Sequence, residues 1–292
     1  MLSLLAAAQD APLYWADLGL TRGIDLGFFT LRWYSLAYLA GIVLGYWHLS
    51  RMIKAPGAPM AQRHADDLFF WCTLGIILGG RLGYATFYTG GETGIPSLWS
   101  QPGELLKLWN GGMSFHGGLI GTVLAMAWVS WRGKLSFLRV ADYVAVCVPF
   151  GMLFGRLANF VNGELWGRVA TGVPWAMIFP DGGPLPRHPS QLYEAGLEGL
   201  LLGALLLWLA FRADSAFRRP GLISGTFFAG YGIARFLVEF FRQPDAQFVT
   251  ADNPLGLYLH LGGYGLTAGQ ILSLPMVLVG VWFVMRARRD PA

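Results

Sequence analysis

Long apolar stretches are the feature that most constrains what this chain can fold into. Each is about 20 residues long, the length at which a helix can cross the hydrocarbon core of a bilayer. They cover residues 31–49, 68–88, 113–131, 138–162, 190–211, 221–241 and 267–286. The pattern predicts an all-α integral membrane protein, a polytopic bundle of about seven transmembrane helices in a single domain over residues 1–292. The fourth stretch contains Pro149, where we expect a kink or a break.

The composition supports a membrane protein and excludes several other classes. Of the 292 residues, 54% are hydrophobic and only 13% are charged, whereas a soluble domain carries about 25% charged residues. Disordered, coiled-coil and collagen-like chains are excluded on the same grounds. The net charge of +4 does not indicate nucleic-acid binding, because the basic residues punctuate the apolar stretches instead of forming one stripe. Cys72 and Cys147 lack the spacing of metal ligands, so we expect no metal site.

Basic residues are distributed unevenly between the two sides of the predicted bundle. Twelve lie in the connections after the first, third and fifth stretches and in the C-terminal tail, and five lie on the opposite side. The positive-inside rule therefore predicts an outward N-terminus and a cytoplasmic C-terminus. It places the longer loops 89–112, 163–189 and 242–266 on the outer side. The apolar start, Met1–Ala8, is too short for a signal-peptide core, and we expect it to remain in the mature protein.

Ionisable groups inside the predicted spans are functional candidates, because burying them in a membrane is energetically costly. They are Arg81, Asp142, Arg156, Glu194, Glu198, Arg235 and Glu239, with His116 and Arg242 at span ends. The predicted orientation brings five side chains from different spans to the level of the outer leaflet. These five are Tyr34, Arg81, His116, Arg156 and Arg242.

Helical spacing places two polar groups on single helix faces. Arg156 and Asn159 are three residues apart, and Arg235, Glu239 and Arg242 share another face. Glu239 can neutralise one arginine but not both, so we expect a surplus positive charge that an anion would satisfy. A purely structural ion pair is the favoured alternative for Arg235 with Glu239.

Other structural alternatives remain for the remaining groups. Glu194 and Glu198 can simply hold helices together, and for Arg81 the two interpretations balance. For His116 and Arg156 the functional interpretation is favoured, because neighbouring glycines would let a ligand approach the backbone closely.

The residue types indicate a ligand that carries a phosphate. The planar guanidinium of arginine matches phosphate geometry, and arginines at outer-leaflet depth suit a phospholipid headgroup. A nearby histidine can act as a base. Walker, HExxH and GxSxG motifs are absent from the sequence. The residues alone therefore indicate a membrane protein that binds a lipid phosphate, with a histidine available for acid–base chemistry.

Four sequence strings allow a more specific interpretation than the residue types alone. They are HGGLIG at residues 116–121, GRLANFVNGELWGR at 155–168, PRHPSQLYE at 186–194 and EFFRQPDAQF at 239–248. Together they resemble the bacterial prolipoprotein diacylglyceryl transferases, and the resemblance extends from Arg32 to Ser273. One mild difference is Ala158, where a glycine is common.

The resemblance implies a seven-span enzyme of the bacterial inner membrane with its active site towards the periplasm. The implied reaction transfers the sn-1,2-diacylglyceryl group of phosphatidylglycerol to the lipobox cysteine of a prolipoprotein signal peptide. A thioether forms, sn-glycerol 1-phosphate leaves, and no cofactor is required. The nucleophile belongs to the substrate.

The resemblance also implies roles for individual residues. His116 is the candidate base, with Glu164 as the alternative, and Arg242 would stabilise the leaving group. Arg156 would bind the lipid phosphate. Further candidate phosphatidylglycerol-binding residues are Asn159, Tyr34, Gly167, Arg81 and Arg235.

Two other classes of function compete with the transferase. A phospholipid transporter or lipid-binding scaffold would also use arginines at the outer leaflet, but a transporter would be expected to show internal repeats. An intramembrane hydrolase would need a Ser–His or Asp–Asp pair within the spans. Neither feature is visible in the sequence.

Overall fold

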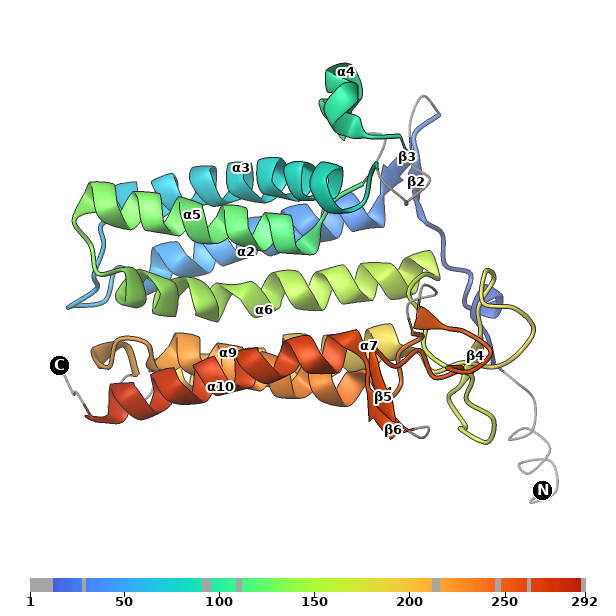
Figure 1. Ribbon diagram of the computed structural model, residues 1–292. Helices are drawn as coiled ribbons and strands as arrows, with labels where there is room; N and C mark the ends of the chain where they lie inside the picture. The colour runs from blue at the N-terminus through green and yellow to red at the C-terminus, as the bar shows by residue number, and fades with distance from the viewer. Residues whose placement is uncertain are drawn as a thin grey trace, which may run out of the picture. The chain divides into compact units, whose positions relative to one another are not determined.

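The computed structural model describes residues 13–27, 30–90, 96–108, 112–211, 216–244, 248–261 and 264–289, and Met1–Ala8 lies outside them. Helices form over every predicted apolar stretch. They are α2 (Trp33–Met52), α3 (Gln62–Phe87), α5 (Phe115–Gly133), α6 (Phe137–Asn162), the run α7 (Ser190–Glu194), η5 (Ala195–Leu201) and α8 (Leu202–Phe211), then α9 (Leu222–Val238) and α10 (Ala268–Arg289). The helical fold class is thereby confirmed (Figure 1).

Four helices of the described residues are long and apolar enough, by length and composition, to cross a membrane. They are Gln62–Phe87, Phe137–Asn162, Ser190–Phe211 and Ala268–Ala287. The number of spans and the direction of the termini stay predictions.

Two helix details are finer than the sequence prediction. Helix α6 continues through Pro149, so the expected break is not found there and a kink stays a prediction. Helix α9 ends at Val238, and Arg242 lies just after the turn that follows it.

The chain folds into two compact units. The first comprises residues 46–144 and is built on α3 packed against α5. The two helices meet along glycines, with Gly117 and Gly121 of α5 facing Gly79 and Gly75 of α3. A Cβ atom at Gly117 would overlap the carbonyl oxygen of Gly79. The glycines therefore allow the two backbones to touch.

A short helix, α4 (Pro102–Leu105), and the 3-10 turn η3 (Leu98–Ser100) precede α5.

The second unit comprises residues 1–45 and 145–292. Helices α9 and α10 lie side by side in it (Figure 1), and a Cβ atom at Gly225 would lie 2.8 Å from the carbonyl oxygen of Gly280.

The predicted loops of this unit contain short strands. Strand β1 (Leu13–Tyr14) pairs in parallel with β4 (Met177–Ile178), whereas β2 (Gly23–Asp25) with β3 (Thr30–Arg32), and β5 (Leu259–Leu261) with β6 (Tyr264–Leu266), form antiparallel pairs.

A small hydrophobic core fixes the loop that follows α6. It is formed by Trp15, Met177 and Phe179, which are all buried. The Trp15 indole N–H donates a hydrogen bond of 2.8 Å to the carbonyl oxygen of Phe160, near the end of α6. The loop is thereby anchored to the end of α6 that carries the predicted polar face.

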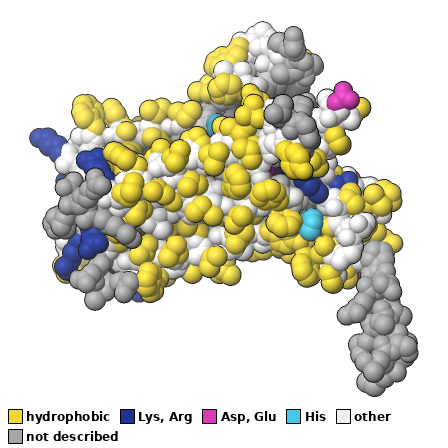
Figure 2. Space-filling view, turned by 60° about the horizontal axis from the view of Figure 1, so that its bottom comes forward, with side chains coloured by type: hydrophobic (Ala, Val, Ile, Leu, Met, Phe, Trp, Pro, Cys, Tyr) yellow, Lys and Arg dark blue, Asp and Glu magenta, His cyan; other side chains and the backbone are white. Residues whose placement is uncertain are grey.

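Large hydrophobic side chains remain exposed along the helices. Phe70 on α3 is 58% exposed, Leu124 on α5 is 64% exposed and Leu278 on α10 is 70% exposed. On the face drawn in Figure 2, hydrophobic side chains cover the flanks of the helices. Helices with such flanks need an apolar environment, which supports a multi-pass membrane protein.

Candidate functional site

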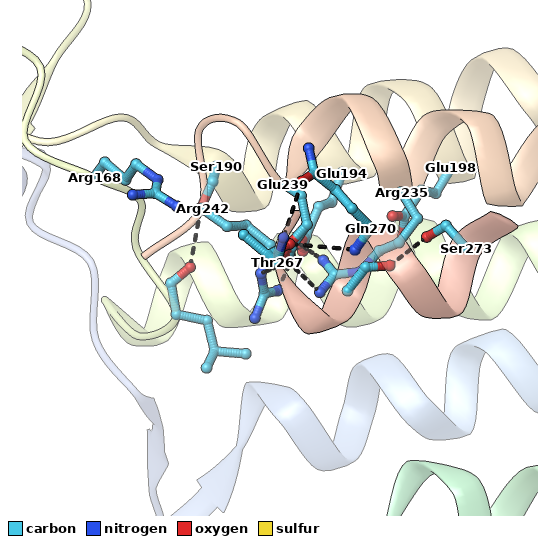
Figure 3. Close-up of polar contacts among 12 residues, drawn as sticks. Arg168, Ser190, Glu194, Glu198, Arg235, Glu239, Arg242, Thr267, Gln270 and Ser273 are labelled. Atoms are coloured by element: carbon cyan, nitrogen blue, oxygen red, sulfur yellow. Dashed lines mark hydrogen bonds and ion pairs between the residues drawn. The ribbon is translucent and has the colours of Figure 1, made fainter. Parts of the chain in front are cut away.

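A cluster of arginines and glutamates lies between α6, the α7–η5–α8 run and α9, all within the second unit. Glu194 is at its centre. Its Oε2 atom lies 2.8 Å from Arg156 Nε, and its Oε1 atom lies 3.1 Å from an Arg235 guanidinium nitrogen and 2.7 Å from one of Arg242. Figure 3 shows Arg235 and Arg242 turned towards Glu194. One carboxylate thus holds three guanidinium groups, one from α6 and two from α9 and the residues just after it.

Glu239 is the second carboxylate of this cluster. It lies 2.7 Å from Arg235 and 3.4 Å from Arg242 Nε, and it accepts a hydrogen bond of 3.3 Å from the hydroxyl of Thr267. A Cβ atom at Gly269 would lie 2.6 Å from the Glu239 carboxyl carbon, so a larger residue there would displace the carboxylate. The predicted ion pair between Arg235 and Glu239 is confirmed.

Glu194 and Glu198 arrive from another helix, so the arginines of this face do not depend on Glu239 alone for their counter-charge. Glu198 Oε2 lies 3.9 Å from Arg156 Nε. Three arginines are therefore matched by three glutamates if all six groups are ionised. Partners from a different helix cannot be read from spacing along a single helix.

Burial differs between the two kinds of side chain. The Glu194 and Glu198 side chains are at most 1% exposed, whereas those of Arg156, Arg235 and Arg242 are 18–24% exposed. The carboxylates thus orient the guanidinium groups from behind and leave part of each accessible. Guanidinium groups held in this way are preorganised donors for a phosphate or carboxylate.

A polar edge continues from this cluster along the end of α6. The side-chain amides of Asn159 and Asn162 donate hydrogen bonds of 2.8 and 3.2 Å to the same oxygen, Oε1 of Glu164. Glu164 itself is exposed. Tyr34, which is 39% exposed, interacts electrostatically with Glu164 and Arg156. The predicted polar face of α6 is therefore present, and the exposed Glu164 carboxylate lies at its end.

Gly167 joins the loop after α6 to the segment that carries Arg242. The two residues form an antiparallel bridge, and the Gly167 N–H donates a hydrogen bond of 2.8 Å to the carbonyl oxygen of His188. A Cβ atom at Gly167 would overlap the carbonyl oxygen of Phe241. Three backbone segments meet at position 167, which leaves no room for a side chain there. The same contacts fix the position of Arg242.

The motif at residues 186–194 contributes two side chains that the sequence did not single out. Arg187 donates a hydrogen bond of 2.9 Å to the Gln243 side chain, and its guanidinium lies 4.2 Å from the centre of the Trp166 ring. His188 Nδ1 lies 3.1 Å from the Tyr193 hydroxyl. Burial lowers the pKa of His188. Both side chains brace the loop around Arg242.

His116 lies in the first unit, on the first turn of α5, and its side chain is exposed. Ser114 caps this helix by accepting a hydrogen bond of 3.2 Å from the Gly117 N–H. The functional interpretation of His116 relied partly on glycines that would admit a ligand. That argument is wrong for Gly117, because this glycine faces helix α3.

Arg81 is 5% exposed, and its guanidinium is surrounded by backbone carbonyls of the segment before α5. It donates hydrogen bonds of 2.7 Å to Glu104, 2.9 Å to Leu105 and 3.1 Å to Gly112. This geometry is that of a residue that organises a loop.

No group of three His, Cys, Asp or Glu side chains among the described residues is arranged to hold a metal ion. The fold and the site together define a class: a multi-pass helical membrane protein with an arginine cluster held by buried glutamates.

Comparisons with known proteins identify the family. A family model described as prolipoprotein diacylglyceryl transferase matches residues 23–286. A phosphatidylglycerol–prolipoprotein diacylglyceryl transferase of Erythrobacter litoralis is 58% identical over 284 residues, 97% of this chain and 95% of the relative. Relatives with the same name from Ruegeria pomeroyi and Roseobacter denitrificans are 53% and 51% identical, over 90% and 91% of this chain and 92% of each relative. The chain belongs to the prolipoprotein diacylglyceryl transferase family.

Proposed function

We propose that this chain transfers the sn-1,2-diacylglyceryl group of phosphatidylglycerol to the lipobox cysteine thiol of prolipoprotein signal peptides. The observation that carries the proposal is the arginine cluster around Glu194, in a chain that matches the family over 23–286. The reaction breaks the bond between the glycerol carbon and the phosphate oxygen and forms a carbon–sulfur bond. The phosphate oxygen keeps the electron pair and leaves as sn-glycerol 1-phosphate. No step requires a cofactor.

The arginines bind the phosphodiester and stabilise the leaving phosphate. Arg156 binds the lipid phosphate, and Arg242 neutralises the charge that develops on the leaving oxygen. Arg235 supports both from the middle of the cluster, where it lies within 3.1 Å of Glu194 and 2.7 Å of Glu239. Loss of one preorganised donor typically raises a barrier by about 3 kcal/mol.

The thiol proton is removed by a base, because the thiolate is the reactive form of cysteine. His116 is the proposed base; its exposed ring on the first turn of α5 supports this role. Glu164 is the alternative, since its carboxylate is exposed and its Oε1 is oriented by Asn159 and Asn162. The proton is finally carried by the released glycerol phosphate.

Other predicted residues bind or position the lipid headgroup. Asn159 and Tyr34 contact polar headgroup atoms in this proposal, which is supported by the hydrogen bond from Asn159 to the exposed Glu164 carboxylate and by the electrostatic interaction of Tyr34 with Glu164. Gly167 positions Arg242 through the backbone bridge. Arg81 acts through the loop that it holds.

We further propose the inner membrane as the location of this chain, with the N-terminus and the active site on the periplasmic side and seven spans forming one transferase domain. The asymmetry of twelve basic residues against five supports this orientation.

The proposal is tested by incubating the purified chain in detergent with phosphatidylglycerol and a synthetic lipobox peptide. The expected result is a gain of one diacylglyceryl mass on the peptide together with release of glycerol phosphate. A peptide with serine in place of the cysteine is the control and should gain no mass. Binding of phosphatidylglycerol by folded protein with no mass gain on the cysteine peptide would favour a lipid transporter or scaffold instead.

A further inference from the structure

Glu198 is a buried acid that the proposed reaction does not use. Its side chain is 0% exposed, and among the described residues neither carboxyl oxygen accepts a hydrogen bond. The nearest cation is Arg156, whose Nε lies 3.9 Å from Glu198 Oε2 and 2.8 Å from Glu194 Oε2. An ionised carboxylate buried without a donor is strongly disfavoured.

Glu198 belongs to a segment whose backbone packs closely against α6. It belongs to η5, a π-helical segment. This conformation is rare in proteins, and where it occurs it is often at a functional site. The next residue, Gly199, lies so close to α6 that a Cβ atom on it would be 2.7 Å from the Cα of Leu153. This contact holds the backbone that carries Glu198 close to α6, the helix of Arg156.

Four charged side chains interact electrostatically with Glu198: Arg156 on α6, Glu194 on α7, and Arg235 and Arg242 on and after α9. The Tyr231 phenol on α9 interacts with it as well. With Glu239 included, the ion-pair network holds three arginines and three glutamates. Its net charge is zero if Glu198 is ionised and +1 if Glu198 is protonated. Protonation of Glu198 adds one positive charge to this network, which a phosphodiester anion can neutralise.

We propose that Glu198 is a positioning residue that carries a proton whenever a phosphodiester anion occupies the arginine cluster, so that lipid binding is coupled to the uptake of one proton. This inference rests on the proposed function. A proton taken from solution lets the anion enter without leaving an uncompensated negative charge in a buried site. The neutral Glu198 leaves Arg156 to Glu194 and to the phosphate. Because the bound state holds the extra proton, lipid affinity falls as the pH rises.

The variant Glu198→Gln tests the coupling, because the amide has the shape of the protonated acid and cannot ionise. For the wild type, KM for phosphatidylglycerol should rise by about tenfold per pH unit above the pH at which free Glu198 ionises. In Glu198→Gln this rise should disappear, so that KM for phosphatidylglycerol no longer depends on pH over this range. The matched control is Asp181→Asn, an acid-to-amide change in an exposed ion pair with Arg22, which should keep the wild-type profile. An unchanged KM profile in Glu198→Gln, or complete loss of activity in a folded variant, would overturn the proposal.

A measurement on the wild type keeps the test independent of how the variant folds. Calorimetric titration with a short-chain phosphatidylglycerol, in two buffers of different ionisation enthalpy, counts the protons taken up on binding. Uptake should approach one proton per lipid as the pH is raised, and zero uptake at every pH would refute the coupling. Absence of transfer activity in the wild type would instead count against the proposed function, so the two failures are distinguishable.

Discussion

Glu194 is the residue on which most of the site depends, because it holds Arg156, Arg235 and Arg242 at once. We expect Glu194→Gln to destabilise the fold by about 3 kcal/mol or more, since it leaves partly buried arginines without their counter-ion. Thermal unfolding in detergent measures the change. The matched control, Asp181→Asn, removes a carboxylate whose side chain is 72% exposed and should cost less than about 1 kcal/mol. Equal losses in the two variants would show that Glu194 does not organise the cluster.

His188 makes the stability of the loop around Arg242 sensitive to acid. Burial lowers its pKa in the folded chain below the value of about 6.5 expected in the unfolded chain. Below about pH 6.5 the unfolded state binds more protons than the folded state. The free energy of unfolding therefore decreases as the pH is lowered through this range, and it does not depend on His188 at higher pH. We expect His188→Gln to show a smaller drop in melting temperature between about pH 7.5 and pH 5.5 than wild type. An equal drop would assign the acid sensitivity to other groups.

At the residue scale, the sequence indicated the arginines better than it indicated what holds them. Arg156 and Arg242 stood out because a charge inside an apolar stretch needs a reason. Glu194 carried the same signal but was favoured as a structural residue, and its three partners come from segments up to 48 residues away. Pairing across helices depends on tertiary packing, which spacing along one helix does not contain.

At the scale of elements, the glycines between α3 and α5 make the clearest prediction. A Cβ atom at Gly117 would overlap the Gly79 carbonyl oxygen, whereas one at Gly118 would find its nearest neighbour, the Ile76 carbonyl oxygen, at 3.6 Å. Gly117→Ala should therefore destabilise the fold by about 1–3 kcal/mol through steric overlap. Gly118→Ala should be neutral or slightly stabilising, because alanine favours the helix. Thermal unfolding of both variants compares the same substitution at two neighbouring positions of one helix. A lower melting temperature for Gly118→Ala than for Gly117→Ala would contradict the described packing of α3 against α5.

The helices were predictable because an apolar stretch of about 20 residues has few alternatives. The π-helical segment Ala195–Leu201 and the three small strand pairs could not be predicted from the sequence. Their hydrogen bonds are set by neighbouring segments and leave no periodic pattern in the sequence. The sequence also did not show whether Pro149 breaks its helix, and α6 continues through it.

At the scale of the whole molecule, the orientation in the membrane is open to a direct test. In a background without Cys72 and Cys147, Asp181→Cys lies in a predicted outer loop and Ala58→Cys in a predicted inner connection. A thiol reagent that cannot cross membranes should label Asp181→Cys in intact cells, and Ala58→Cys only after the membrane is opened. The reverse pattern would contradict the positive-inside assignment.

The central claim is that the arginine cluster binds the phosphate of phosphatidylglycerol during diacylglyceryl transfer. The most direct measurement compares Arg156→Ala with Arg22→Ala, an arginine in an exposed ion pair with Asp181, in the peptide transfer assay. We predict that Arg156→Ala loses about 100-fold or more of the transfer rate, as expected for the loss of about 3 kcal/mol of transition-state stabilisation, and that Arg22→Ala keeps the wild-type rate. Folded Arg156→Ala that transfers the diacylglyceryl group at the wild-type rate would contradict the account.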